Sequence, residues 1–285
     1  MTRQPVVARR AEDLLGTAVV ATAPVAGGDI ATATKLRLSD GTTALMKTHP
    51  RPPAGFFAAE ARGLRWLAEA GGAPVPDVLA GDEECVIIRW VEQGKPTSEA
   101  AVAFGHDLAT THAAGAPSFG LDRDGFIGRL PLANEPVATW AEFYAERRVR
   151  PYLRLGLERG TVSREQAATV EAALGRLGDL VPEEPPARLH GDLWNGNVLW
   201  GHDGRVWLVD PAAHGGHRET DLAMLALFGL PHLARVTAAY AEASPLADGW
   251  QDRVGLHQLH PLLVHACLFG GGYAARAAEA AAPYA

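Results

Sequence analysis

The strongest constraint on the fold comes from polar residues spaced along one short stretch near residue 200. The segment HGDLWNGN at 190–197 places Asp192 five residues before Asn197, and Asp210 follows thirteen residues after Asn197. The mostly hydrophobic segments 197–200 and 205–209 flank the turn HDG at 202–204, in which Asp-Gly is a typical hairpin signal. The spacing therefore predicts a β-hairpin that carries Asn197 and Asp210 to the same end of two paired strands.

This set of side chains is the one that phosphoryl transfer requires. One carboxylate accepts the hydrogen bond and the proton of an acceptor hydroxyl, and an amide with a second carboxylate holds metal ions on the phosphates. We therefore expect Asp192 to be the catalytic base, with Asn197 and Asp210 as Mg²⁺ ligands on ATP. The structural alternative is a simple turn at Asp192 and a hairpin cap at Asn197, but it leaves the spacing to Asp210 unexplained.

Composition narrows the class of protein. The chain has 285 residues, a net charge of -7 and 47% hydrophobic residues. The negative charge argues against binding to nucleic acid or to an anionic membrane surface. No long apolar run predicts a membrane span, and the N-terminal residues lack the hydrophobic region of a signal peptide. We interpret the two cysteines, Cys85 and Cys267, as small buried apolar residues. Because two cysteines cannot form a disulfide framework, we expect a cytoplasmic protein.

The first ninety residues are rich in predicted strands. Alternating or apolar segments predict strands at 33–38, 43–47, 75–79 and 85–91, and helical spacing predicts one helix over 56–70. The segment EQGKP at 92–96 is the best candidate for a hinge. We therefore predict an N-terminal nucleotide-binding lobe at 1–92 and a catalytic and substrate-binding lobe at 93–285.

Beyond the hinge, helical patterns dominate apart from the hairpin. Helices are predicted at 100–114, 137–157, 163–180, 220–227, 233–242 and 250–269. Only about ten residues separate Asp210 from the next helix, which leaves no room for the activation segment of a protein kinase.

Two further features of the N-terminal region suit a nucleotide. Gly27 and Gly28 lie between two predicted strands, where glycines let backbone N–H groups approach phosphate oxygens, although an ordinary turn also contains such a pair. Lys47 ends a predicted strand, and Glu60 follows thirteen residues later in the predicted helix. Because the chain has only three lysines, we interpret Lys47 as a phosphate ligand that Glu60 holds in place rather than as a surface residue.

With these residues in hand, the chain resembles the fructosamine kinase, or ketosamine 3-kinase, family. The resemblance rests on HGDLWNGN at 190–197, DPA at 210–212 and GHRETDLAM at 216–224, with shorter matches at 119–120, 127–128, 227–229 and 268–273. It implies an α+β, protein-kinase-like bilobal fold, with an antiparallel sheet and one main helix in the N-lobe. A larger, mostly helical C-lobe would contain the catalytic hairpin.

The family also implies an activity. It implies that ATP and Mg²⁺ serve to phosphorylate the 3-hydroxyl of a ketosamine, which is a ribulosamine, erythrulosamine or fructosamine adduct of an amine or protein. Such phosphates are unstable, so that the amine is released in a deglycation reaction. We expect a monomer rather than an obligate oligomer. The sequence departs from the family at Ala31, where members often have Asn or Ser after Gly-Gly-x-Ile, and at 213–215, where members often have an aromatic pair. These departures concern the phosphate contacts and the sugar preference.

The resemblance suggests roles for further residues. The backbone from Trp90 to Glu92 would contact adenine at the junction of the lobes. Trp194 would stack on the sugar, although a core position is the alternative. His190 would support the catalytic loop, residues 190–197, from behind. Asp221 would brace the same loop or cap a helix.

The segment before Asp221 contains three further polar residues. His217, Arg218 and Glu219 are candidates for substrate contacts, although Arg218 has a glutamate as an alternative partner. The runner-up enzyme is an aminoglycoside or amino-alcohol phosphotransferase of the same fold, which a strongly acidic pocket would favour. An inactive nucleotide-binding module would have lost Lys47 or Asp192, and both are present.

Overall fold

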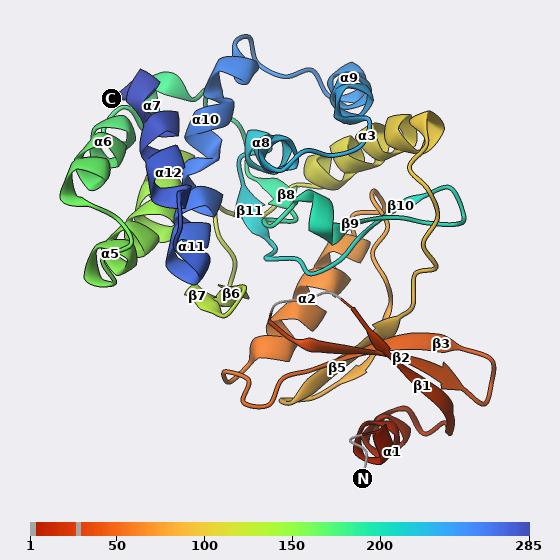
Figure 1. The fold of residues 1–285 in the computed structure, drawn as a ribbon. Helices are drawn as coiled ribbons and strands as arrows, with labels where there is room; N and C mark the ends of the chain where they lie inside the picture. The colour runs from red at the N-terminus through yellow and green to blue at the C-terminus, as the bar shows by residue number, and fades with distance from the viewer. Residues whose placement is uncertain (1–3, 27–29) are drawn as a thin grey trace.

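The N-terminal region is built on one antiparallel sheet (Figure 1). The computed structural model describes residues 4–26 and 30–285. The sheet has the order β1-β2-β3-β5-β4, and all neighbouring strands are antiparallel. Its strands are β1 (Val19–Val25), β2 (Thr32–Leu38), β3 (Thr43–Thr48), β4 (Val78–Gly81) and β5 (Cys85–Arg89). The predicted strands at 33–38, 43–47 and 85–91 are confirmed, whereas the one predicted at 75–79 begins later, at Val78.

Two helices, and not the single one predicted, cover this sheet. Helix α2 (Phe56–Ala68) is the predicted one, and α1 (Gln4–Leu15) is additional. Alternation along β5 explains why both are needed, because Cys85 and Ile87 pack in the cluster that contains α1, whereas Val86 and Ile88 pack in the cluster that contains α2. A strand that is apolar on both faces needs a covering element on each side.

The remainder of the chain is mostly helical (Figure 1). Its helices are α3 (Ser98–Ala113), α4 (Trp140–Phe143), α5 (Arg150–Glu158), α6 (Arg164–Leu174), α7 (Leu177–Leu180), α8 (Glu219–Leu227), α9 (Leu233–Ala243), α10 (Val254–His257), α11 (Leu259–Phe269) and α12 (Tyr273–Ala281). The helix predicted at 137–157 is divided, because a π-helical turn at Tyr144–Val149 joins α4 to α5. The one predicted at 250–269 is divided as well, with a 3₁₀ turn at Trp250–Arg253 before α10.

Three two-stranded sheets lie within the helical region. The predicted hairpin is confirmed as β9 (Val198–Trp200) paired with β10 (Val206–Leu208). Two further pairs were not predicted, namely β6 (Gly125–Ile127) with β7 (Leu130–Leu132), and β8 (Ala187–Leu189) with β11 (His214–Gly216). Strands of three residues are too short to show a periodicity in the sequence.

The hydrophobic core runs across the junction of the two regions. One cluster joins Leu64 of α2 and Ile88 of β5 to Leu193, Val198 and Leu222 of the helical region. A second cluster lies among α4, α5, α6, α11 and α12. The shared cluster includes residues of the catalytic hairpin and of α2, so that one core supports both. No helix of the described residues is long and apolar enough to cross a membrane.

Candidate active site

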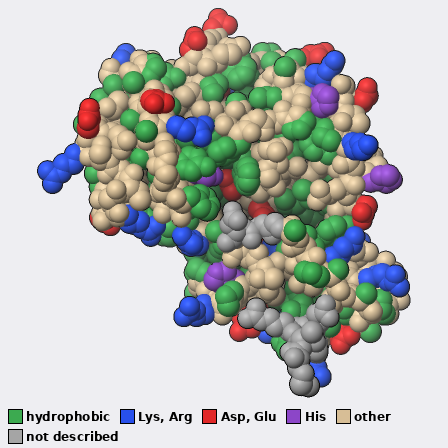
Figure 2. Space-filling view, viewed as in Figure 1, with side chains coloured by type: hydrophobic (Ala, Val, Ile, Leu, Met, Phe, Trp, Pro, Cys, Tyr) green, Lys and Arg blue, Asp and Glu red, His purple; other side chains and the backbone are tan. Residues whose placement is uncertain are grey.

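A cleft of about 850 Å³ lies where the sheet region meets the helical region. Figure 2 shows the molecule hollowed between its smaller and its larger part. Seven of the residues predicted from the sequence line this cleft: Lys47, Glu60, Trp90, Asp192, Trp194, Asn197 and Asp210. They come from β3, α2, the end of β5, the loop after β8 and the end of β10. The fold therefore brings together groups that lie up to 163 positions apart in the sequence.

Lys47 is the cationic centre of the cleft. Its ammonium donates a hydrogen bond to Glu60 Oε1 at 2.6 Å and forms an ion pair with Asp210. Lys47 is 7% exposed, whereas the Asp210 side chain is 47% exposed. A buried ammonium is tolerated only when it is paired, so Glu60 fixes the position of Lys47 at the edge of the more accessible Asp210.

Asp192 and Asn197 are joined by a specific hydrogen-bond arrangement. The Asn197 amide nitrogen donates to the Asp192 backbone oxygen at 2.8 Å and to Asp192 Oδ2 at 3.1 Å. Because the amide nitrogen is used in this way, the Asn197 side-chain oxygen is left to face away from Asp192. Burial and the nearby charge of Asp221 raise the pKa of Asp192, whereas the hydrogen bond from Asn197 lowers it. Burial has the largest effect, and the resulting pKa is about 7. A carboxyl of that pKa suits proton transfer near neutral pH.

The catalytic loop rests on Asp221, which lies at the start of α8. Asp221 is fully buried, and its carboxylate accepts hydrogen bonds from the backbone N–H of His190 at 2.8 Å and of Gly191 at 3.0 Å. Burial alone would raise the pKa of Asp221, but hydrogen bonds that include those from His112 and Gly191 lower it below its usual value. The geometry fits the predicted brace, and no side-chain cap at the start of α8 is formed.

Gly191 is needed at its position for two reasons. Its φ of +80° lies in the left-handed region, which favours glycine. A Cβ atom there would lie 2.2 Å from the backbone oxygen of Ala212 and 2.8 Å from His214 Nδ1. The close approach packs the catalytic loop against the segment that follows Asp210.

His190 ties the catalytic loop to the end of β10. Its Nδ1 accepts a hydrogen bond from the Asp192 N–H at 3.2 Å, and its Nε2 lies 2.9 Å from the Val209 backbone oxygen. Burial lowers the pKa of His190, so that the neutral ring has one nitrogen to accept and one to donate. The His190 ring thereby links the residue before Asp210 to the backbone of Asp192.

The backbone at Asp210 is strained. Its φ of 55° is left-handed, which is uncommon for a residue with a side chain, and Pro211 disfavours helical conformations before it. Such strain persists where the surrounding structure determines it, and it is common at functional sites. Here the hydrogen bond between His190 and Val209 holds the preceding residue in place.

Two residues of the loop support were missed by sequence reasoning. His112 of α3 places Nε2 3.2 Å from Asp221 Oδ2, and its Nδ1 lies 2.8 Å from the Tyr240 hydroxyl of α9. Both residues are buried. The only signal in the sequence was polar character within otherwise apolar helical patterns, which does not identify a partner.

Trp194 lies on the cleft wall, where it belongs to a series of aromatic rings in contact with one another. Its ring is half-buried and packs edge-on against Phe228, with 5.7 Å between the ring centroids. Phe228 in turn contacts His265, and His265 contacts Phe269. The position of Trp194 on the cleft wall leaves it available to a ligand and excludes the alternative of a wholly buried core residue.

Only part of the segment 90–92, which was predicted to contact adenine, lines the cleft. Trp90 lines the cleft, but Glu92 does not, because its side chain turns to Lys35 at 3.2 Å and to the Trp90 indole N–H at 2.8 Å. The Glu92 backbone oxygen is also occupied, since it accepts from the His202 N–H at 2.8 Å. Glu92 is therefore corrected to a residue that supports the cleft wall. Val91, which lies within the predicted segment, lines the cleft beside Trp90.

The structure places His217, Arg218 and Glu219 away from the cleft, which corrects their assignment to substrate binding. None of them lines the cleft, because the chain turns from β11 into α8 behind the catalytic loop. Arg218 donates to both carboxylate oxygens of Glu184 at 2.7 Å, which is the alternative left open for it. Arg253 likewise donates to both oxygens of Glu219, at 2.9 and 2.6 Å.

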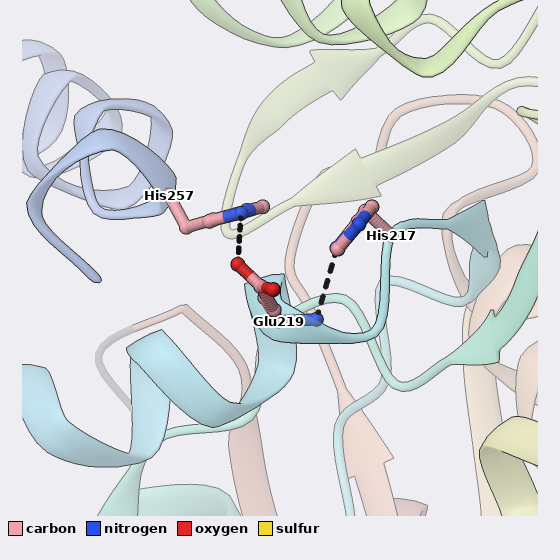
Figure 3. Close-up of side chains that lie close together, drawn as sticks. All are labelled: His217, Glu219 and His257. Carbon is pink, nitrogen blue, oxygen red and sulfur yellow. Dashed lines mark hydrogen bonds and ion pairs between the residues drawn. The ribbon is translucent and has the colours of Figure 1, made fainter. Parts of the chain in front are cut away.

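Figure 3 shows His217, Glu219 and His257 side by side, with a ligand atom of each within 4.8 Å of the others. His257 Nε2 lies 3.2 Å from Glu219 Oε2, and His217 Nδ1 accepts from the Glu219 N–H at 3.3 Å. Burial alone would raise the pKa of Glu219, but the contacts with His257 and Arg253 lower it to about 2. Because the guanidinium of Arg253 engages both carboxylate oxygens, we interpret this cluster as an ion-pair network that fixes the start of α8.

Two other predictions remain, of which the structure confirms one and does not describe the other. Gly27 and Gly28 lie outside the described residues, so their role stays a prediction. Cys85 and Cys267 are free and buried, which confirms their interpretation. His257 and His260 are buried within the helical region, whereas His265 reaches the cleft.

Comparison with known proteins agrees with this geometry. The family model described as fructosamine kinase matches residues 4–283. A probable ketoamine kinase of Enterococcus faecium is 33% identical over 255 residues, which are 88% of this chain and 90% of that protein. A probable ketoamine kinase of Thermus thermophilus is 36% identical over 251 residues, with 88% of each chain covered.

The solved structures extend the comparison to three dimensions. A crystal structure from Thermobifida fusca, provisionally described as a fructosamine-3-kinase, has a TM-score of 0.93 at 50% identity and covers 96% of each chain. A macrolide 2′-phosphotransferase has a TM-score of 0.65 at 19% identity, and shares the fold. These likenesses confirm the α+β, protein-kinase-like fold predicted from the sequence. The chain therefore belongs to the fructosamine kinase family and is an ATP-dependent phosphotransferase that acts on an alcohol group.

Proposed function

We propose that this enzyme phosphorylates the 3-hydroxyl of ketosamines, with ribulosamine and erythrulosamine adducts as well as fructosamines among its acceptors. The observation that carries the proposal is the meeting of Asp192, Asn197, Asp210 and Lys47 in one cleft beside an aromatic wall. The phosphate ester would then eliminate and free the amine, which amounts to deglycation in the cytoplasm. Residues 1–92 would act as the nucleotide lobe and 93–285 as the catalytic lobe.

The chain offers suitable ligands for Mg²⁺. The side-chain oxygen of Asn197 and the accessible carboxylate of Asp210 are the oxygen ligands that this ion prefers. The ion would neutralise charge on the phosphates of ATP when bound. Lys47, held by Glu60, supplies a fixed positive charge beside Asp210. The Mg²⁺ ligands and Lys47 support an arrangement in which the nucleotide, the metal ion and the catalytic base follow one another across the cleft.

Asp192 would perform the proton transfer. Its carboxylate takes the proton of the acceptor hydroxyl while that oxygen bonds to the γ-phosphorus, and the bond from phosphorus to ADP breaks. The hydrogen bond from Asn197 to Oδ2 holds the carboxylate in one orientation. The N–H contact with His190 and the support from Asp221 fix the backbone behind it. Asn197 thus orients the carboxylate of the base, while His190 and Asp221 hold the backbone behind it.

The aromatic wall favours a sugar adduct over a polycation. The ring contacts of Trp194 lead through Phe228 to His265 and Phe269 on the cleft wall, and none of these residues is acidic. An aminoglycoside, which carries several ammonium groups, is best bound by a strongly acidic pocket. Trp194 instead offers a flat apolar face to the C–H surface of a sugar. This composition supports a ketosamine rather than the runner-up substrates.

A substrate panel tests the proposal. ADP release would be measured with ATP and Mg²⁺ and a set of ribulosamine, erythrulosamine and fructosamine adducts, choline and an aminoglycoside. We expect ketosamines to be turned over best, and their phosphorylated products to decay with release of the free amine. Vigorous phosphorylation of the aminoglycoside or choline without ketosamine turnover would establish the runner-up function. Failure of all acceptors, with ATP still bound, would point to the inactive module.

A further inference from the structure

One cation of the cleft has no role in the reaction described above. Arg62 of α2 lines the cleft, is half-buried, and has a buried Nε without a hydrogen-bond partner. Its guanidinium makes one hydrogen bond within the described chain, from Nη2 to the Asp124 backbone oxygen, at a long 3.4 Å. Among the described residues, no carboxylate lies within the 4.0 Å of an ion pair to it. Most of its N–H groups therefore have no partner among the described residues.

Other arginines with a similar defect show that this arrangement is unusual. Arg10 and Arg147 also have a buried Nε without a partner. Each of them is nevertheless neutralised through Nη2, Arg10 by Asp82 at 2.6 Å and Arg147 by Glu135 at 2.7 Å. Arg62 lacks such a carboxylate within the described part of the chain, although it lines the cleft proposed to bind the substrates. A buried, unpaired N–H is costly, so a ligand that pairs with it gains affinity.

The helix fixes the direction in which Arg62 points. Residues two positions apart on an α-helix point about 160° away from each other, so Arg62 leaves α2 on the flank opposite to Glu60 and its partner Lys47. That flank faces β6 and the loop before it, as the contact with Asp124 shows. Gly63, between the two flanks, faces Pro211, since a Cβ there would lie 3.2 Å from the Pro211 Cγ. Arg62 thus lies in the cleft but away from the ammonium of Lys47.

We propose that Arg62 is an oxyanion receptor of the cleft and that it selects acceptors carrying a carboxylate, such as ketosamines formed from free amino acids. The planar guanidinium presents its N–H groups as a fork that matches the two oxygens of a carboxylate. A terminal phosphoryl group offers the same chemistry, but the position of Arg62 opposite to Glu60 favours the acceptor. This inference rests on the proposed function and specifies its substrate class.

The test uses two acceptors that differ by one charge, namely the ribulosamines of glycine and of glycinamide. Kinetics would be measured for the wild type and Arg62→Ala, and ATP and ADP binding would be measured by calorimetry. We expect Arg62→Ala to lower kcat/KM roughly ten- to a hundredfold for the glycine adduct, as for the loss of a charged hydrogen bond. The glycinamide adduct and the affinity for ATP should stay nearly unchanged.

Controls separate the sources of the oxyanion. Arg62→Lys should restore only part of the preference, because the ammonium keeps the charge without the fork. Arg123→Ala serves as the matched control, since Arg123 also lines the cleft but has a side chain that is 69% exposed. Weaker binding of ATP but not of ADP, with equal losses for both acceptors, would place the γ-phosphoryl group at Arg62 and overturn carboxylate selection.

Two further results are informative. Unchanged kinetics and binding in a folded Arg62→Ala variant would overturn any oxyanion role. If the wild type phosphorylated neither ribulosamine, the proposed substrate would be wrong. Binding of the two ribulosamines to the wild type and to Arg62→Ala, measured by calorimetry, would then still decide whether Arg62 selects the carboxylate, so the two failures are distinguishable.

Discussion

Replacing Asp221 by Asn should show that a residue outside the cleft controls the catalytic loop. The carboxylate accepts hydrogen bonds from His190 N–H, Gly191 N–H and His112 Nε2, at 2.8, 3.0 and 3.2 Å. An amide of the same shape has one acceptor oxygen and turns its NH₂ toward a donor. Because breaking a buried charged contact costs about 3–5 kcal/mol, we expect the free energy of unfolding to fall by that amount.

The same change should lower the rate of catalysis. A misplacement of about 1 Å at a catalytic group costs on the order of a hundredfold in rate, so we expect kcat to fall by one to two orders of magnitude. The KM for ATP should change little, because Lys47 and Asp210 do not contact Asp221. Urea unfolding followed by circular dichroism gives the stability, and ADP release gives the kinetics with the acceptor that the substrate panel identifies.

A matched substitution provides the control. Asp13→Asn changes an exposed aspartate of α1 whose side chain makes no hydrogen bond or ion pair with the described residues, and it should leave the free energy of unfolding within about 0.5 kcal/mol of wild type. If Asp221→Asn proved as stable as this control and kept its kcat, the catalytic loop would not depend on the buried carboxylate. The reasoning about the brace would then be refuted.

Three further predictions concern the base, the sugar contact and the ion-pair network. Asp192→Asn should lower kcat by about 10²–10⁴-fold with unchanged ATP affinity, and near wild-type turnover would disprove its role as base. Trp194→Ala should raise the KM for the acceptor roughly five- to tenfold, as for the loss of an aromatic contact, whereas equal increases for ATP would argue against stacking. The lowered pKa of Glu219, about 2, should contribute about 3 kcal/mol of stability above pH 4.5 that is lost progressively toward pH 2. Urea unfolding across this range should show a loss in the wild type that Glu219→Gln lacks, and parallel curves would contradict this assignment.

The catalytic hairpin was predictable because its signals are local. The turn at 202–204 and the apolar segments beside it specify two paired strands, which the structure confirms as β9 and β10. Lys47 and Glu60 were predictable for a similar reason, since each lies in an element with a clear pattern. Their ion pair at 2.6 Å then follows from packing α2 on the sheet.

The short strands and the additional helix were not predictable in the same way. Three-residue strands such as β8 and β11 exist because distant segments supply their partners, and their own sequences carry no period. Helix α1 follows from the need to cover the second face of the sheet, a requirement that appears only when the strands are assembled. The division of the helix predicted at 137–157 reflects the π-helical turn at Tyr144–Val149, which places the buried Arg148 among polar partners.

Residue types and spacings along the chain were sufficient to establish a phosphotransferase, because the chemistry needs two acids, an amide and a lysine in a recognisable order. Tertiary packing alone decided which neighbouring polar residues face the ligand. His217, Arg218 and Glu219 lie close to the catalytic residues in sequence, yet the turn into α8 directs them to Glu184 and Arg253 behind the loop. No pattern in the sequence indicated a role for Arg62, yet the packing of α2 places it in the cleft. Side-chain direction depends on how elements pack against one another, and that information is not local to any segment.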